Sequence, residues 1–274
     1  MTLRLGWFTT ARGPGSRSMF EAVRGAIERG ELDAEFGVLF CNRERGEAEA
    51  TDTFLDLVEA QGIPLVTRSS VRYRRAAAGA RSRPGESLPA WRLDYDRGVE
   101  EALAPHPFDL GVLAGYMLIF EREFVARHPL LNLHPALPDG PAGIWQEVIR
   151  ALIRARATES GVMTHLAIPE VDAGPPATYC RYSLRGPRLD PLWEELEPRI
   201  DRLDDNALER TPLFASIRAE GVAREAPFLV ATLAEFAAGR LHIRVGRVTD
   251  AAGAPVPPRD VTSEVEARLS AVRT

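Results

Sequence analysis

Asn132 and His134 lie in the stretch LLNLHPALP, residues 130–138, where polar and apolar residues alternate as in a half-buried strand. Side chains two positions apart on a strand project from the same face, so we expect these two side chains to lie together. Pro135 cannot continue the hydrogen bonding of a sheet, which places the pair at the end of the strand. A histidine in an apolar run also fits a structural role, but an asparagine on the same face indicates a candidate catalytic pair.

His165 and Asp172 flank a loop in a second polar stretch, THLAIPEVDAGPP. An asparagine amide and a protonated histidine can donate hydrogen bonds to a developing oxyanion, and a carboxylate can accept a proton. Asn132, His134 and Asp172 together therefore suit the attack of an amine on an acyl carbon. Asp172 by itself also fits the ordinary chemistry of a turn. No serine or cysteine is indicated as a covalent nucleophile.

Strand-like runs alternate with helical patterns along the chain, which predicts an α/β fold. We expect a doubly wound, mostly parallel twisted sheet with helices on both faces and a Rossmann-like N-terminal half. Ligands bind such sheets beyond the carboxyl ends of the strands. The predicted strands are 3–9, 35–42, 64–67, 109–115, 129–135, the start of 161–176, and 177–184. The predicted helices are 16–29, 53–61, 143–157, 204–219 and 223–238.

Composition excludes several classes of protein. The net charge of -5 argues against a dedicated nucleic-acid-binding protein, which usually carries a strongly basic face. No apolar run approaches the length of a membrane span, and the N-terminus lacks the features of a signal peptide, so we expect a cytoplasmic protein without a membrane partner. Cys41 and Cys180 lack metal-ligand spacing, and we expect no metal.

The stretch GPGSRSMFEAV follows the first predicted strand and opens a helix. Gly13 and Gly15 permit close approach of the backbone, and the free N–H groups before Ser16 and Arg17 can bind an anion. A plain turn between a strand and a helix also fits this stretch. The glycine fingerprint of nicotinamide enzymes is incomplete here, and the second strand ends without an acidic residue, which disfavours an oxidoreductase.

Residues 68–83, RSSVRYRRAAAGARSR, hold six arginines and no acidic residue. One interpretation is a solvated loop without a ligand. The other is a basic flap that covers an anionic ligand.

DLGVLAGYMLIFEREFVARHPLLNLHPALP, followed by GVMTHLAIPEVDAGPP, resembles the folate-dependent formyltransferase family. The family pattern is an apolar strand that ends in Ala-Gly-aromatic-Met, then Asn-x-His-Pro, then a histidine several residues before Asp-x-Gly-Pro. All of it is present in order and at similar spacing. The branch of the family that formylates glycinamide ribonucleotide in purine biosynthesis resembles it most. A weaker resemblance covers residues 3–62 and 91–242.

The resemblance implies a formyltransferase domain over 1–249, with residues 68–90 as an Arg-rich insertion and 250–274 as a peripheral C-terminal tail. It implies 10-formyltetrahydrofolate as the donor co-substrate. The implied catalytic residues are Asn132, His134 and Asp172. The implied folate-binding residues, several of which would act through their backbone, are Arg92, Met117, Leu118, Ile119, Phe120, His165, Ile168, Glu170 and Val171. The implied acceptor-binding residues are Gly13, Gly15, Ser16, Arg17 and Glu225.

The acceptor is expected to be a small primary amine that is anionic or phosphorylated, with glycinamide ribonucleotide as one candidate. The family has asparagine where this chain has Arg17, and usually arginine where it has Leu118. Such departures leave other amines open, such as an amino sugar or a specialised metabolite. A hydrolase that releases formate is a further alternative, although those relatives usually carry an additional N-terminal domain and this chain begins at its first strand. The last alternative is a non-catalytic homologue that binds a ligand.

Overall fold

The computed structural model describes residues 2–81, 87–170 and 173–273. Over these residues, one sheet contains eight strands in the order β10-β7-β6-β5-β4-β1-β2-β3, and β8 and β9 form a separate hairpin. The strands are β1 Leu3–Thr9, β2 Ala34–Cys41, β3 Leu65–Thr67, β4 Leu110–Leu113, β5 Leu130–His134, β6 Glu159–Leu166, β7 Pro176–Ser183, β8 His242–Arg244, β9 Arg247–Thr249 and β10 Arg259–Asp260. The helices are α1 Pro14–Glu28, α2 Glu49–Ala60, α3 Ser70–Ala76, α4 Trp91–Leu103, α5 Arg122–Arg127, α6 Trp145–Arg154, α7 Asp190–Leu196, the 3₁₀ helix η1 Glu197–Arg202, α8 Asp205–Glu209, α9 Pro212–Ala237 and α10 Thr262–Arg273.

The sheet is mostly parallel, which confirms the predicted fold class. Strands β3, β2, β1, β4 and β5 run parallel to one another, whereas β6 runs antiparallel to β5, and β7 antiparallel to β6. The chain builds outward from β1 through β2 and β3, then returns to place β4 on the other side of β1. Loops that leave β1 and β4 therefore diverge, and the crevice between them is where such sheets hold ligands.

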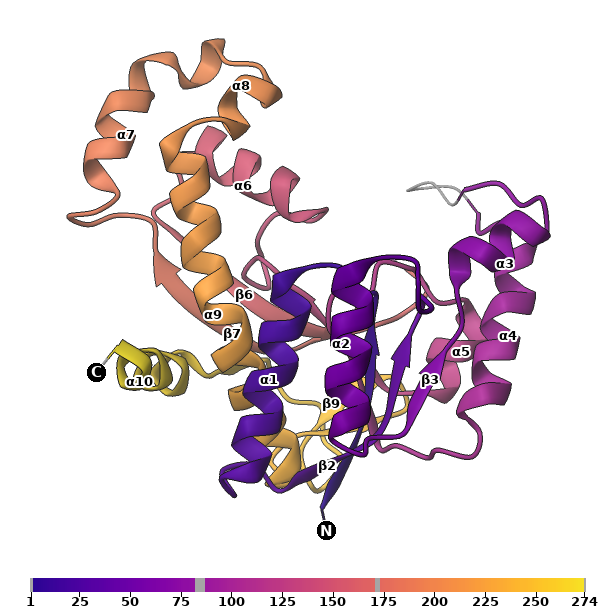
Figure 1. The fold of residues 1–274 in the computed structure, drawn as a ribbon. Helices are drawn as coiled ribbons and strands as arrows, with labels where there is room; N and C mark the ends of the chain where they lie inside the picture. The colour runs from indigo at the N-terminus through magenta and orange to yellow at the C-terminus, as the bar shows by residue number, and fades with distance from the viewer. Residues whose placement is uncertain (1, 82–86, 171–172, 274) are drawn as a thin grey trace.

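Helices cover both faces of the parallel half of the sheet (Figure 1). Successive side chains of β1 point to opposite faces of the sheet. Trp7 packs in one core with α1, α2 and α9. Phe8 packs in the other core with α4 and α5. Both side chains are fully buried. The continuous apolar character of β1, β2 and β4 follows from this double covering.

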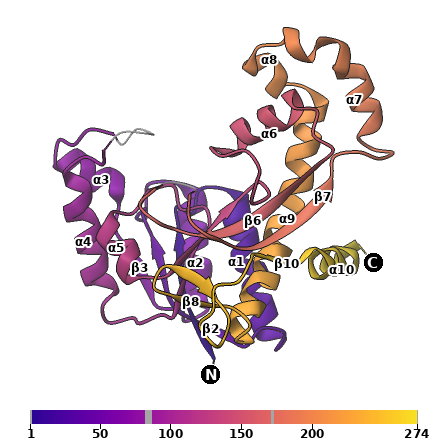
Figure 2. The same ribbon diagram turned by 180° about the vertical axis from the view of Figure 1, so that it is seen from behind.

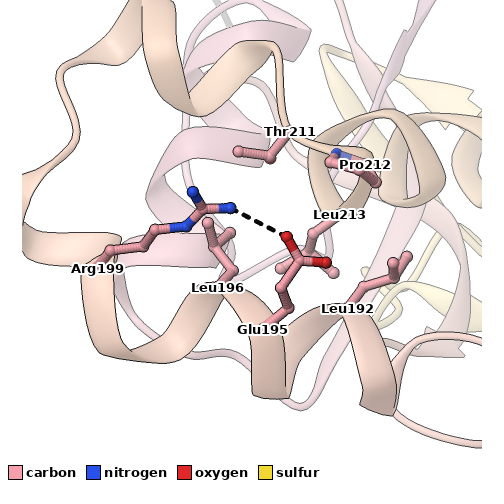
Figure 3. A pocket seen from close by; sticks show the side chains of 7 residues that line it. All are labelled: Leu192, Glu195, Leu196, Arg199, Thr211, Pro212 and Leu213. Atoms are coloured by element: carbon pink, nitrogen blue, oxygen red, sulfur yellow. Dashed lines mark hydrogen bonds and ion pairs between the residues drawn. The ribbon is translucent and has the colours of Figure 1, made fainter.

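A group of short helices, α7, η1 and α8, packs on α6 and the first half of α9 beyond the sheet (Figures 1 and 2). Trp193 is buried in its core. A cavity of about 10 Å³ beside α7 has room for a single water molecule. Figure 3 shows the ion pair between Arg199 and Glu195 at this cavity, 3.1 Å long. The lining residues are Leu192, Glu195, Leu196, Arg199, Thr211, Pro212 and Leu213.

Helix α9 corrects the two helices predicted over 204–219 and 223–238. The segment from Pro212 to Ala237 is one continuous helix with Pro227 inside it. A proline removes one hydrogen bond of a helix and usually kinks or ends it. Here Phe228, Leu229 and Leu233 are buried directly after the proline, and this packing holds the helix together across it.

Residues 250–274 were expected to form a peripheral tail, and this expectation is wrong for the part that follows residue 258. Strand β10 extends the main sheet by pairing with β7. Val261 and Val265 are buried against β6, β7 and α9 in a small apolar cluster. Arg259 of β10 also pairs with the buried Glu235 of α9 at 2.7 Å.

The Arg-rich stretch is helical and largely exposed over part of its described residues, and residues 82–86 lie outside the described residues. Residues 70–76 form helix α3, capped by the Ser69 side chain, which accepts from Arg72 N. The Arg72 guanidinium pairs with Glu44 at 2.8 Å and Glu47 at 3.2 Å. The acidic partners of Arg72 therefore come from the loop after β2.

Within the described ranges, no helix combines the length and the apolar character needed to cross a membrane.

We expect Val265→Ala to lower the free energy of unfolding by about 2 kcal/mol, because the substitution leaves a cavity in a packed cluster. The matched control is Val245→Ala, since Val245 is fully exposed. Urea unfolding followed by circular dichroism measures both. Equally small changes would mean that α10 does not pack on the sheet.

Candidate active site

Asn132 and His165 face each other across the β5–β6 pair. The register aligns Leu113 of β4 with Asn132, and Asn132 with His165, so that all three lie in one row at the carboxyl end of β4. Asn132 Nδ2 lies 3.1 Å from His165 Nε2, and His165 Nδ1 lies 3.0 Å from the Leu166 carbonyl oxygen. A carbonyl only accepts, so Nδ1 carries a proton, and Nε2 of the neutral ring accepts from the Asn132 amide. The amide is thereby fixed in one orientation.

His134 lies two residues further along β5, at the strand end that the sequence predicts. Its side chain is 3% exposed, and its ring centroid lies 6.2 Å from that of His165. His134 Nε2 donates to the Pro141 carbonyl at 3.0 Å, so Nε2 carries a proton in either charge state of the ring. The loop that follows β5 therefore fixes the tautomer and the orientation of this histidine.

The loop after β6 returns to the same row. Leu166 N donates to the Pro175 carbonyl at 3.0 Å and closes the base of the loop. A Cβ atom added to Gly174 would lie 1.8 Å from the Leu166 oxygen and 3.4 Å from His165 Nδ1, so only glycine fits there. Asp172 and Val171 lie outside the described residues. The catalytic role of Asp172 stays a prediction.

The two segments predicted to line a folate pocket lie side by side. Arg122 and Glu170 pair across them at 3.7 Å. Met117 is 74% exposed, and its backbone N–H donates to Thr10 Oγ1 at 3.1 Å. Phe120 is buried and stacks on Tyr116 and Phe124, with centroid distances of 4.8 and 4.1 Å. Phe120 can therefore offer a ligand only its backbone, whereas Leu118, Ile119 and Ile168 are half-buried.

Arg92 is not a surface contact for a folate tail in this structure, which corrects the expectation drawn from the resemblance. Its side chain is fully buried on α4 and pairs with the equally buried Asp96 at 3.0 Å. Arg92 Nη2 also donates to the Ile119 carbonyl at 2.6 Å. Burial raises the pKa of Asp96, and the Arg92 charge opposes that rise.

Residues predicted to bind the acceptor converge on the N-terminus of α1. Gly13 is the N-cap, with an extended backbone, and Ser16 Oγ donates to its carbonyl at 2.9 Å. A Cβ atom on Gly15 would lie 3.7 Å from Glu225 Oε2, so Glu225 of α9 reaches this helix end. A Cβ atom added to Gly115 would lie 3.1 Å from the Cβ atom of Ser16. The start of α1 therefore lies against the loop after β4.

Two arginines near this helix end behave differently. The Arg17 side chain bonds to Glu21 on the exposed surface of α1, at 2.9 Å. Arg218 of α9 was not predicted from the sequence. Its Nη1 atom donates to Glu225 Oε1 at 2.9 Å, and its guanidinium lies 4.7 Å from the Trp145 ring centroid. Its position seven residues before Glu225, two helical turns away on the same face, is the signal that would have identified it.

Neither cysteine is placed as a nucleophile. Burial raises the pKa of the Cys41 and Cys180 thiols to about 11, so neither is a thiolate at neutral pH. No group of three or more His, Cys, Asp or Glu side chains in the described part of the chain is arranged to hold a metal ion.

We expect Gly174→Ala to lower the free energy of unfolding by about 1–3 kcal/mol, because the added methyl group meets the Leu166 backbone. Gly25→Ala is the matched control: its Cβ would meet only the flexible end of Arg29, and alanine favours the helix there. Chemical denaturation of both variants measures the difference. A Gly174 variant as stable as the Gly25 variant would contradict the close approach.

Comparison with known proteins shows the family and the fold of the chain. The family model described as formyl transferase matches residues 14–182. Phosphoribosylglycinamide formyltransferase of Dictyostelium discoideum is 40% identical over 173 residues, 58% of this chain and 75% of that protein. Among solved structures, phosphoribosylglycinamide formyltransferase of Coxiella burnetii has a TM-score of 0.64 at 21% identity, with 95% of this chain and 100% of that chain covered. A formyltetrahydrofolate deformylase from Pseudomonas syringae has a TM-score of 0.58 at 14% identity, with 91% and 66% covered. The protein is a formyltransferase and belongs to the formyl transferase family.

Proposed function

We propose that the protein transfers the formyl group of 10-formyltetrahydrofolate to the primary amine of a small anionic acceptor. The observation that carries the proposal is the fixed arrangement of Asn132, His134 and His165 at the carboxyl end of β4, in a chain of this family. Glycinamide ribonucleotide is the acceptor we favour, since similar proteins are named phosphoribosylglycinamide formyltransferase.

In the proposed reaction, the acceptor nitrogen attacks the formyl carbon, and a carbon–nitrogen bond forms as the carbonyl oxygen becomes an oxyanion. The Asn132 amide and protonated His134 stabilise that charge by hydrogen bonding. The amine proton passes to the Asp172 carboxylate, directly or through water. Cleavage of the bond between the formyl carbon and N10 then releases tetrahydrofolate, whose nitrogen takes up a proton. The other product is the formylated amine.

The acceptor is proposed to bind at the α1 N-terminus. Free backbone N–H groups at a helix start attract an anion, and the Arg218 guanidinium adds a positive charge nearby. The Glu225 carboxylate, held by Arg218, can accept hydrogen bonds from acceptor hydroxyl groups. A phosphorylated, hydroxyl-bearing amine satisfies both groups. Other amines with an anionic group fit the same arrangement.

Hydrolysis of the donor to formate is the second candidate function. A formyltetrahydrofolate deformylase has a similar fold, and this similarity is the observation that favours hydrolysis as an alternative. Water would then replace the amine as the nucleophile. Incubation with 10-formyltetrahydrofolate alone separates the two functions: formate release at the full rate without any amine would identify the hydrolase, whereas release of tetrahydrofolate only with an amine identifies the transferase.

We expect His134→Ala and Asp172→Asn each to lower kcat by about 10²–10⁴-fold, because each removes a positioned group that acts in the transition state. His242→Ala is the matched control, since His242 Nε2 also donates to a backbone carbonyl at 3.0 Å but lies on the β8–β9 hairpin. Formation of tetrahydrofolate with a panel of amines measures the rate. Unchanged turnover in both variants would reject these catalytic assignments.

We expect Arg218→Ala to raise the KM for the acceptor by about tenfold or more, with little change in the KM for the folate, because the lost cation would face the acceptor. Arg188→Ala provides the control. Arg188 pairs with Glu220 of α9, the helix that also contains Arg218, but its side chain is 74% exposed. Steady-state kinetics with each substrate varied in turn measures both constants. Equal effects of the two substitutions on the acceptor would place the acceptor elsewhere.

A further inference from the structure

The ion pair between Arg92 and Asp96 is unusual in this protein because both side chains have no exposed surface. Most of the other ion pairs among the described residues have at least one partly exposed partner. Moving two charges out of water carries a large penalty, which their attraction often fails to recover. Arg92 Nε and Nη1 are also buried and make no hydrogen bond with the residues described. Stability alone therefore accounts poorly for this pair.

Both members of the pair bind the backbone of the segment that follows β4. Arg92 Nη2 donates to the Ile119 carbonyl at 2.6 Å, and Asp96 Oδ2 accepts from the Glu121 N–H at 2.9 Å. The two bonds lie on either side of Phe120. Thr10 Oγ1 accepts from Met117 N at the start of the same segment. The backbone of residues 117–121 is thus held at three points, and two of these are the buried pair.

Aromatic stacking of Phe120 does not replace these bonds. The stack between Tyr116 and Phe124 fixes the position of the ring, whereas the orientation of the neighbouring peptide groups depends on partners for their N–H and C=O atoms. The Arg92 guanidinium is itself held over the rings of Trp91 and Tyr95, at 5.3 and 5.8 Å. Its reach toward Ile119 is therefore fixed in advance of any ligand.

We propose that Arg92 and Asp96 are positioning residues that orient the backbone of residues 119–121 for folate binding, and that they act on the folate rather than on the acceptor. The inference rests on the proposed function, in which this segment lines the folate pocket through its backbone. Neither side chain touches the folate. Each acts through the peptide groups that it holds.

Arg92→Lys and Asp96→Asn test the proposal with little change in volume. Lysine keeps the charge but lacks the planar fork that serves two acceptors, and asparagine keeps one acceptor oxygen. Calorimetric titration with tetrahydrofolate measures folate binding without acceptor or turnover. We expect each variant to bind tetrahydrofolate about tenfold more weakly. The acceptor KM at saturating donor should stay within about twofold of the unaltered value.

Glu100→Gln is the matched control. Glu100 lies on the same helix and pairs with Arg127 of α5 at 2.6 Å, so it also joins α4 to the region after β4 without touching residues 119–121. Its tetrahydrofolate affinity should not change. Thermal melting of all three variants establishes that they are folded.

Amide hydrogen exchange provides a measurement that needs no variant. The Glu121 N–H should exchange slowly in the ligand-free protein, because Asp96 already binds it; rapid exchange would overturn the inference. Wild-type-like tetrahydrofolate binding by both folded variants, or an equal rise in the acceptor KM, would also overturn it. Failure of the unaltered protein to bind tetrahydrofolate would instead reject the proposed donor, and the inference with it.

Discussion

The hydrogen bond between Asn132 and His165 depends on the direction in which β6 enters the sheet. Residues directly opposite in an antiparallel pair carry their side chains on the same face, within contact distance. The register Asn132–His165 uses this geometry, and a slip of one residue would turn either side chain to the opposite face. The reversal of strand direction at β6 therefore assembles the polar row, and the parallel strands before it place that row beside the loops after β1 and β4.

Much of this arrangement could be predicted from the sequence because the signals are local. The alternation in residues 130–134 indicates a strand, and Pro135 marks its end, as observed. Gly13, Gly15 and Ser16 follow the first strand and open a helix, also as observed. The family motifs tie distant segments together, so the meeting of the segments that contain Leu118 and Glu170 was expected before any coordinates.

The errors concern residues whose environment depends on distant parts of the chain. The resemblance implied Arg92 as a direct folate contact, but its side chain is buried and its partners include a carbonyl 27 positions away. The arginines of α3 looked unpaired because Glu44 and Glu47, the partners of Arg72, precede them by more than 20 residues. Local patterns do not record such contacts. The two helices predicted over 204–219 and 223–238 were wrong for a similar reason, since the packing that keeps α9 continuous is tertiary.

The placement of β10 has a consequence for the behaviour of the protein in concentrated solution. An edge strand with free N–H and C=O groups can pair with a strand of another molecule and start aggregation. Strand β10 covers part of the outer edge of β7 and is itself two residues long, and α10 packs directly after it. At the opposite edge, β3 has three residues. Both ends of the sheet thus offer only short templates, which disfavours edge-to-edge pairing between molecules.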